Sequence, residues 1–221
     1  SVHCRAMPPS SPIDLPERLN IAQWFLDARL DEGLADKTAI YFHDSGASGS
    51  HADAQVREVS YAELVKLSCR VTNLLRELGL GIEDRVLLLL PDTPAWAAAF
   101  FGIVRAGCVA VPANTWLKAK DYAYYLEYAR PKAVIVDASL WPALDEARQL
   151  EPHPTRRFIV HDRSGAPVPA GTHDLAAALR ELPDHAATEP TYRDDFATWL
   201  SSSGSTGKPK CVVHMHHDFV W

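Results

Sequence analysis

Short apolar runs alternate with amphipathic segments over most of this chain, and this alternation constrains the fold more than any other feature. Residues 85–90 are predicted as a strand, and all of them after Arg85 are apolar, which is typical of a strand buried on both faces of a parallel sheet. Strand–helix–strand order with short turns produces right-handed crossovers. The predicted fold class is therefore α/β, a doubly wound, mostly parallel sheet with flanking helices. Further strands are predicted at residues 108–111, 133–136 and 158–160, and helices at residues 60–78, 95–106, 118–128, 140–150 and 172–182.

The segment before the alternating region predicts a helix followed by an antiparallel pair of strands. Apolar residues recur on one helical face over residues 21–30, and residues 38–42 and 57–60 have strand character. Ser60 and Glu63 match a capping box. In that motif the serine hydroxyl accepts from the amide of Glu63, and the Glu63 carboxylate accepts from the amide of Ser60.

Aromatic residues on two predicted helices are expected to pack in the core. Trp96, Phe100 and Phe101 recur at helical spacing. Arg105, near the end of the same helix, is expected at the surface, and Asn114 in a turn. A second helix carries an aromatic cluster for which packing is the simplest role, namely Tyr122, Tyr124, Tyr125 and Tyr128.

A run rich in Ser, Gly and Lys near the end of the sequence is the strongest candidate for a binding site. Hydroxyl groups and turn amides can hydrogen-bond phosphate oxygens, glycines let the backbone approach a ligand, and lysines add positive charge. Strand-like residues 196–200 and 211–213 flank the run and predict a hairpin. The pattern therefore predicts a polyphosphate-binding loop made of Ser202, Ser203, Gly204, Ser205, Thr206, Gly207, Lys208 and Lys210.

This loop is not of the Walker A type. Gly204 and Gly207 are separated by only two residues, and Pro209 follows Lys208 where a Walker A loop has Ser or Thr. Pro209 also lacks a backbone N–H that could bind phosphate. A flexible loop without a ligand is the alternative for an isolated Ser/Gly/Thr run, but the Gly-Lys-Pro-Lys tail and the flanking strands favour phosphate binding.

Composition and charge argue against several other classes of function. The 22 Lys and Arg residues and 28 Asp and Glu residues give a net charge of −6, with no basic stripe, so nucleic acid is not an expected partner. No run approaches the roughly 18 apolar residues of a spanning helix, so no membrane contact is expected. Residues 1–12 contain three prolines and lack the apolar region of a secretory signal, which predicts a disordered lead-in.

Cysteine and histidine patterns indicate reduced thiols rather than metal ligands. No two of the four cysteines form a Cys-x-x-Cys pair, and Cys69 and Cys108 lie in apolar stretches, as expected for buried thiols of a cytoplasmic protein. The run from His214 to His217 lacks the spacing of a zinc motif, so no metal-binding residue is predicted. His216 and His217 are instead expected to open a short helix.

Residues 202–210, S-S-G-S-T-G-K-P-K, resemble the phosphate-binding motif of the adenylate-forming superfamily, which includes acyl-CoA synthetases, luciferases and peptide-synthetase adenylation domains. Two segments within residues 78–114 are similar in order and spacing to the N-terminal region of that family. Residues 15–27 and 36–41 look most like benzoate–CoA ligases and related aryl-CoA ligases. Cys211 departs from the family pattern, in which glycine is common at this position.

The resemblance implies an ATP-dependent acid–thiol ligase. In that family a carboxylate attacks the α-phosphate of Mg²⁺-bound ATP to form an acyl-adenylate and pyrophosphate, and a thiol then takes the acyl group. The implied partners are a small carboxylic acid such as benzoate, ATP, and coenzyme A as the thiol. Lys210 and Thr206 are the implied catalytic residues, and the whole loop is the implied site for the ATP phosphates.

Later motifs of the family, for adenine, ribose and a C-terminal catalytic lysine, do not occur in this sequence. The chain is therefore expected to be an N-terminal fragment, inactive by itself. Its expected parts are a lead-in (1–12), an α/β subdomain (13–182), a linker (183–195) and the start of a further subdomain (196–221). An exposed edge strand would favour self-association or a disordered C-terminal end. Two alternatives stay open: a noncatalytic module completed by another chain, and a peptide-synthetase adenylation domain.

Overall fold

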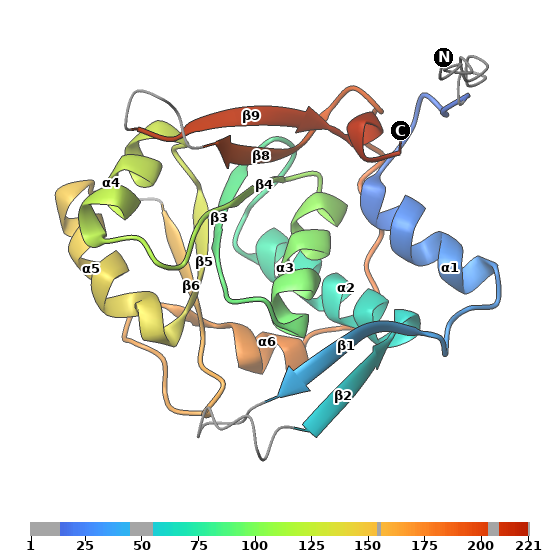
Figure 1. The fold of residues 1–221 in the computed structure, drawn as a ribbon, viewed down its shortest axis with the longest axis horizontal. Helices are drawn as coiled ribbons and strands as arrows, with labels where there is room; N and C mark the ends of the chain where they lie inside the picture. Colours follow the sequence, from blue (N-terminus) through green and yellow to red (C-terminus); the bar gives the residue numbers. More distant parts are fainter. Residues whose placement is uncertain (1–13, 45–54, 154–155, 203–207, 221) are drawn as a thin grey trace, which may run out of the picture.

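A seven-stranded sheet runs through the molecule, in the order β7-β6-β5-β3-β4-β8-β9 (Figure 1). The computed structural model describes residues 14–44, 55–153, 156–202 and 208–220, so the predicted lead-in and residues 203–207 of the loop lie outside the described residues. Neighbouring strands are parallel except for the antiparallel pair β8 and β9. The strands are β3 (Arg85–Leu89), β4 (Val109–Pro112), β5 (Ala133–Asp137), β6 (Arg157–His161), β7 (His173–Asp174), β8 (Phe196–Ser202) and β9 (Lys210–Met215).

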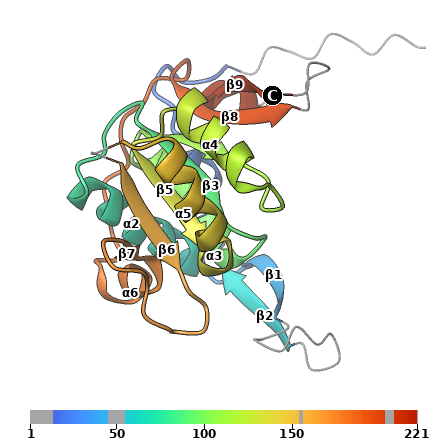
Figure 2. The ribbon, with the colours of Figure 1, turned by 90° about the vertical axis from the view of Figure 1, so that its left-hand side faces the viewer.

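Helices cover both faces of this sheet, which confirms the predicted doubly wound fold (Figures 1 and 2). On β3, Val86 and Leu88 belong to the core cluster of one face, whereas Leu87 and Leu89 belong to the cluster of the other, and all four are 0% exposed. The strand is thus buried on both faces, as its apolar run predicts. One face carries α2 (Tyr61–Glu77), α3 (Pro94–Arg105) and α6 (Leu175–Glu181), and the other α4 (Ala119–Tyr128) and α5 (Trp141–Leu150).

The connections diverge on the two sides of β3. The chain passes from β3 through α3 to β4, and then crosses back through α4 to β5 on the other side of β3. A sheet wound in this way has a crevice outside the carboxyl ends of its strands, where ligands bind in open α/β folds. The predicted helix 172–182 begins later than expected, at Leu175, because His173 and Asp174 pair with β6 as strand β7.

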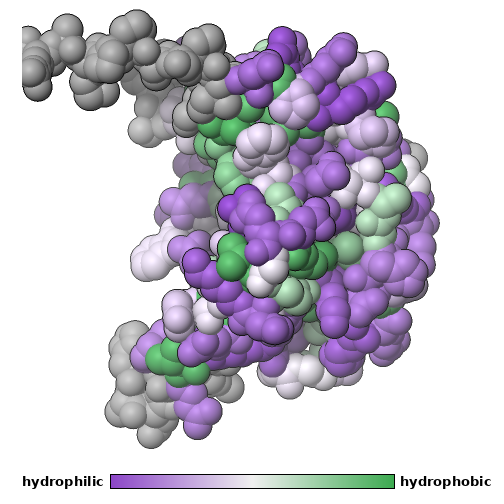
Figure 3. Space-filling model, turned by 90° about the vertical axis from the view of Figure 1, so that its right-hand side faces the viewer, coloured by the Kyte–Doolittle hydropathy of each residue, from purple (hydrophilic) through white to green (hydrophobic). Residues whose placement is uncertain are grey.

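The N-terminal region packs beside the main sheet and contributes Ile21 and Ala22 to its core. The predicted helix 21–30 contains a π-helical turn, η1 (Gln23–Asp27), followed by α1 (Ala28–Asp31). Strands β1 (Thr38–Asp44) and β2 (Gln55–Ser60) form an antiparallel pair, as predicted. The face that this region contributes to is largely hydrophilic, with hydrophobic residues in small groups (Figure 3).

Only half of the predicted capping box at α2 forms. The Glu63 amide donates to the Ser60 hydroxyl over 3.2 Å. The Glu63 carboxylate, however, binds the guanidinium of Arg57 at 2.6 Å, and not the Ser60 amide. An ion pair with a neighbouring strand therefore replaces the second bond of the motif, which local sequence alone does not reveal.

Helices α2 and α3 pack closely because α3 has glycine at the contact. A Cβ atom on Gly102 would lie 2.5 Å from Val71 Cβ and 2.8 Å from the Ser68 carbonyl oxygen. The Gly102 carbonyl oxygen accepts a 2.9 Å bond from the Thr72 hydroxyl. Trp96 stacks on Phe100 with ring centroids 5.4 Å apart; Phe100 belongs to the core on this face, and the half-buried Trp96 and Phe101 pack against it.

Two predicted buried thiols and one histidine complete the core. Cys69 and Cys108 are buried and free, and burial raises the pKa of Cys108 to about 12. His216 opens the short helix η4 (His216–Phe219), as predicted, and its Nδ1 accepts from the Ile21 amide over 3.2 Å. Burial lowers the pKa of His216 to about 4, so the ring is neutral near pH 7. No helix in the described ranges is long and apolar enough to cross a membrane.

The predicted surface position of Arg105 is wrong, because this residue is only 2% exposed. Its Nη1 and Nη2 donate to the two carboxylate oxygens of Asp27 over 2.9 and 2.6 Å. Nη1 also donates to the Thr188 hydroxyl over 2.7 Å, and Nε to the Ser68 hydroxyl over 3.3 Å. The guanidinium thus joins η1, α2, α3 and the segment that leads to β8.

Replacing Asp27 with Asn leaves this guanidinium buried without a countercharge and is expected to lower the free energy of unfolding by about 3 kcal/mol. Replacing Arg105 with Met is expected to cost less, because the Asp27 side chain is 27% exposed and can be hydrated once its partner is gone. Urea denaturation followed by circular dichroism measures both changes.

The matched control is Asp145→Asn, which breaks the exposed Arg148–Asp145 pair, whose side chains are 43% and 33% exposed. Exposed ion pairs contribute less than about 1 kcal/mol, so this variant is expected to unfold almost as the unaltered chain does. A loss for Asp27→Asn no larger than for Asp145→Asn would contradict the structural role of the buried pair.

Candidate functional site

The hairpin of β8 and β9 carries the predicted phosphate-binding loop. Ser202 lies opposite Lys210 and Ser201 opposite Cys211 in the antiparallel register, which confirms the predicted hairpin. The hairpin is joined to the sheet through Thr198, which is paired with Ala110 and whose hydroxyl donates to the Ala110 carbonyl oxygen over 2.7 Å. The inner part of β8 is therefore held in the core, while its end projects outward.

Three of the predicted loop residues fall in the described part of the chain, namely Ser202, Lys208 and Lys210, and all three are exposed. The Ser202 hydroxyl donates to the Lys210 carbonyl oxygen over 3.4 Å. The structure thus brings the first and last residues of the predicted loop together at one end of the hairpin. The other predicted residues, Ser203, Gly204, Ser205, Thr206 and Gly207, lie outside the described residues.

Helix α4 holds the C-terminal side of the loop, a contact that the sequence did not predict. The Tyr124 hydroxyl donates to the Pro209 carbonyl oxygen over 2.9 Å, and the Lys208 ammonium lies 5.1 Å from the centre of the Tyr124 ring. A cation over an aromatic face is attracted by the quadrupole of the ring. Figure 1 shows α4 beside the end of the hairpin where β9 begins.

The other tyrosines of α4 support this contact. Tyr128 stacks on Tyr124 with centroids 5.4 Å apart, and Tyr122 and Tyr125 are buried, as the packing role predicts. Burial raises the pKa of Tyr125, while its hydrogen bond with Ser201 acts in the opposite direction. Desolvation also raises the pKa of Tyr124, so its hydroxyl stays protonated at neutral pH and can donate. The i, i+4 spacing of two tyrosines on one helix was the available signal for this support.

Asn114 takes the turn role expected of it, since its side chain accepts from the Trp116 amide over 2.8 Å. In the described residues no group of three or more His, Cys, Asp or Glu side chains could hold a metal ion. Two lysines and a serine hydroxyl at the end of one hairpin are donors suited to phosphate oxygens. The described part of the site therefore has hydrogen-bond donors and positive charge of the kind that a polyphosphate anion requires.

Comparison with known proteins identifies the family. The model of the AMP-binding enzyme family matches residues 28–221, so the chain belongs to that family. It is 36% identical over 197 residues to a 4-hydroxybenzoate–CoA/benzoate–CoA ligase of Rhodopseudomonas palustris, which covers 89% of this chain and 33% of that protein. It is 34% identical over 209 residues to a benzoate–CoA ligase of Thauera aromatica, covering 94% of this chain and 36% of the relative.

Solved structures agree with the sequence comparison. An anthranilate CoA ligase in complex with anthranoyl-AMP superposes with a TM-score of 0.81 at 30% identity, covering 93% of this chain and 36% of that chain. A benzoate CoA ligase from Burkholderia xenovorans gives a TM-score of 0.72 at 33% identity, covering 91% and 35%. The chain thus spans about a third of the length of the relatives that it matches, and its fold corresponds to the N-terminal part of adenylate-forming enzymes.

Replacing Tyr124 with Phe removes the bond to Pro209 and is expected to loosen the start of β9. Since one hydrogen bond contributes about 0.5–1.5 kcal/mol, amide hydrogen exchange at residues 210–212 should become about three- to tenfold faster. Tyr128→Phe is the control. It keeps the ring that stacks on Tyr124 and removes a hydroxyl that makes no hydrogen bond to the described part of the hairpin. Equal exchange rates in the two variants would contradict the role of Tyr124.

Proposed function

We propose that this chain is the N-terminal part of an ATP-dependent carboxylate–CoA ligase whose acid is aromatic, with benzoate as the simplest candidate. Membership of the AMP-binding family supports ligase chemistry, and relatives named as benzoate and hydroxybenzoate CoA ligases support an aromatic acid. The observation that carries the proposal is the hairpin that places Ser202, Lys208 and Lys210 together at the edge of the sheet.

The proposed reaction has two steps. The carboxylate oxygen of the acid attacks the α-phosphorus of ATP, the bond to the β-phosphate oxygen breaks, and an acyl-adenylate and pyrophosphate result. The sulfur of coenzyme A then attacks the acyl carbon and AMP leaves, which gives the thioester. Carboxylate and triphosphate repel each other, and charge builds up on the departing pyrophosphate. Positioning and charge neutralisation are therefore the main requirements of the first step.

In this proposal the hydroxyls of Ser202, Ser203, Ser205 and Thr206 donate to the β- and γ-phosphates, and Gly204 and Gly207 let the backbone approach them. Lys208 and Lys210 neutralise the phosphate charge. Mg²⁺ enters with ATP, as the counterion of its phosphates, and Thr206 is the loop residue proposed to come nearest to it. Lys210 and Thr206 are the proposed catalytic residues.

The site is proposed to be incomplete within this chain. Adenine, ribose and coenzyme A would be bound by the part of the relatives that this chain does not match, so the chain alone is proposed to be inactive. The proposed parts remain the α/β subdomain (13–182), the linker (183–195) and the start of the next subdomain (196–221). A cytoplasmic location also remains part of the proposal, and the free thiols of Cys69 and Cys108 fit it.

Acid-dependent exchange of labelled pyrophosphate into ATP, measured on the full-length ligase, tests the proposed function. Lys210→Ala or Thr206→Ala is expected to slow this exchange by about 100-fold, the typical cost of removing one charge-stabilising group. Lys66→Ala, which removes an exposed lysine on α2, is the control and should leave the rate unchanged. Exchange that is independent of the acid, or unaffected by both loop substitutions, would refute the proposal.

We further propose that the isolated chain self-associates through the outer edge of the hairpin. β9 is the last strand of the sheet, and Leu200, Val212 and Val213 on the hairpin are 40%, 49% and 39% exposed. An exposed apolar edge strand is a template for pairing with a second copy.

Replacing Val212 with Lys puts a charge on this edge and is expected to convert the associated chain to a monomer in sedimentation velocity runs. Val56→Lys is the matched control, because Val56 is 60% exposed on β2, in the other sheet. A chain that sediments as a monomer at every concentration, or that responds equally to the two substitutions, would contradict association through β9.

A further inference from the structure

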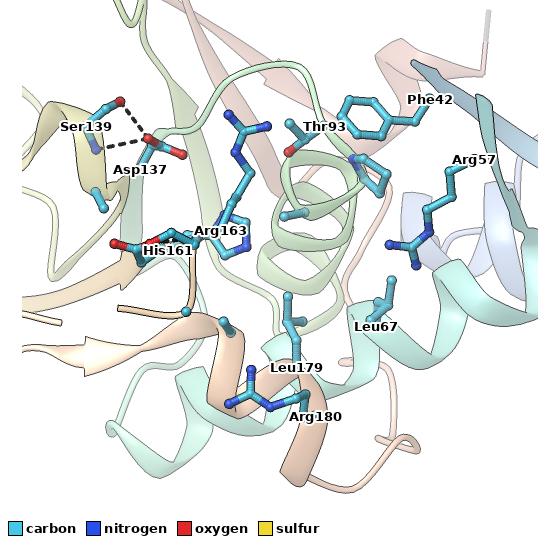
Figure 4. Close-up of a pocket in the computed structure, with 17 residues that line it drawn as sticks. Phe42, Arg57, Leu67, Thr93, Asp137, Ser139, His161, Arg163, Leu179 and Arg180 are labelled. Atoms are coloured by element: carbon cyan, nitrogen blue, oxygen red, sulfur yellow. Dashed lines mark hydrogen bonds between the residues drawn. The ribbon is translucent and has the colours of Figure 1, made fainter. Parts of the chain in front are cut away.

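A cavity of about 700 Å³ lies at the carboxyl ends of β5 and β6, beside the start of α3 (Figure 4). Its walls also include residues of α2, α6 and the β1–β2 pair, and none of the described residues of the β8–β9 hairpin lines it. The chain leaves β3 and β5 toward opposite faces here, which is where open α/β sheets bind ligands. The volume is within the roughly 300–1000 Å³ of small-molecule sites.

Three arginines from separate elements surround this cavity. Arg57 comes from β2, Arg163 from the loop after β6, and Arg180 from α6, and Figure 4 shows their side chains extending toward the cavity. Arg57 is paired with Glu63. Arg163 and Arg180 have no hydrogen bond or ion pair within the described ranges. A guanidinium group can bind a carboxylate or a phosphate through two parallel hydrogen bonds.

The acidic residues of the cavity already have other partners. Asp137 accepts from the amide and the hydroxyl of Ser139 over 3.0 and 2.6 Å. Asp162 accepts from the amide and the hydroxyl of Ser164 over 2.7 and 2.5 Å. Their hydrogen bonds are thus made within their own loops, and neither carboxylate forms an ion pair with Arg163 or Arg180, whose guanidinium donors are left for another anion.

Thr93 adds a polar group that has no partner. It is the N-cap of the 12-residue helix α3 but makes no capping bond, and its hydroxyl oxygen is buried without a hydrogen-bond partner in the described structure. The amino end of a helix has unpaired amides and a partial positive charge, both of which favour a phosphate. Thr93 lines the cavity, so a rotation of its side chain would bring the hydroxyl to an anion bound there.

The remaining wall is apolar. Phe42, Leu67 and Leu179 line the side of the cavity nearer to Arg57 and Arg180 (Figure 4). A ligand that matches the whole cavity therefore needs both an anionic group and an apolar part. Cationic groups from different directions suit a phosphoryl group, whose three oxygens point apart, better than a carboxylate, whose two oxygens lie in one plane.

We propose that this cavity binds a small organic phosphate, separately from the loop of the β8–β9 hairpin. The phosphoryl group lies between Arg163, Arg180 and the amino end of α3, and the apolar part lies against Phe42 and Leu179. The site is separate from the proposed ligase site in the described part of the chain, since Ser202, Lys208 and Lys210 do not line it.

Titration of the ¹⁵N-labelled 221-residue chain with phenyl phosphate, inorganic phosphate and benzoate, followed by NMR, tests this site. Phenyl phosphate is expected to cause saturable shifts at the amides of residues 95–97 and 163–165. Inorganic phosphate should shift the same amides with weaker affinity, because it lacks the ring. Benzoate, which has the ring but a planar monoanion, should bind at least about tenfold more weakly than phenyl phosphate.

Arg163→Gln and Arg180→Gln are each expected to weaken the binding of phenyl phosphate by about tenfold, since each removes charge-assisted bonds. The matched control is Arg157→Gln, an exposed arginine at the opposite end of β6, which should leave affinity unchanged. Thr93→Val should weaken binding severalfold without lowering the thermal midpoint of unfolding, because the hydroxyl has no partner in the ligand-free fold.

Three results would overturn the proposal: no saturable shift at these amides, shifts confined to residues 208–210, or equal weakening by Arg157→Gln and Arg163→Gln. Benzoate binding as tightly as phenyl phosphate would refute the assignment to phosphates. Lys210→Ala, which is expected to slow pyrophosphate exchange, should leave this binding unchanged, so failure of the ligase proposal and failure of this one are distinguishable.

Discussion

The buried guanidinium of Arg105 holds α3 against the N-terminal helical region, α2 and the segment before β8. A charge in the interior needs a countercharge and hydrogen bonds, and here they come from Asp27, Ser68 and Thr188. These three residues lie in the N-terminal helical region, in α2 and in the segment that precedes β8. Since α3 leads into β4, and β4 pairs with β8, the arrangement that satisfies this charge also positions the strand that ends in the phosphate loop.

One sheet thus supports two places suited to anions, and each uses different chemistry. At the hairpin, two lysines and a serine stand at an exposed end, and lysine offers a flexible ammonium group that suits the proposed phosphate ligand. At the switch point of the sheet, Arg163 and Arg180 stand around a cavity beside a helix terminus, an arrangement suited to holding one anion in one geometry. Both depend on buried parallel strands that hold the connecting loops in place.

Local sequence predicted the elements well where one physical effect dominates. The apolar run of β3 predicts a doubly buried strand, and the hydrophobic period of α2 to α5 predicts helices near their observed ends. Prediction failed where a partner outside the local motif decides the outcome. Arg105 resembles an ordinary charge at a helix end, but its ion-pair partner is 78 residues away. Glu63 fits a capping box, but Arg57 competes successfully for its carboxylate.

The sequence by itself determined the α/β class and the family, and it predicts the chemistry of the loop, because periodicity, turn residues and a contiguous motif are properties of neighbouring residues. Only the tertiary structure decided that Arg105 is buried, that Tyr124 reaches Pro209 across 85 residues, and that Arg57, Arg163 and Arg180 surround one cavity. These outcomes depend on contacts between side chains that are far apart in the sequence and that the doubly wound sheet brings together. Burial and ion pairing follow from those contacts, so neighbouring residues alone do not predict them.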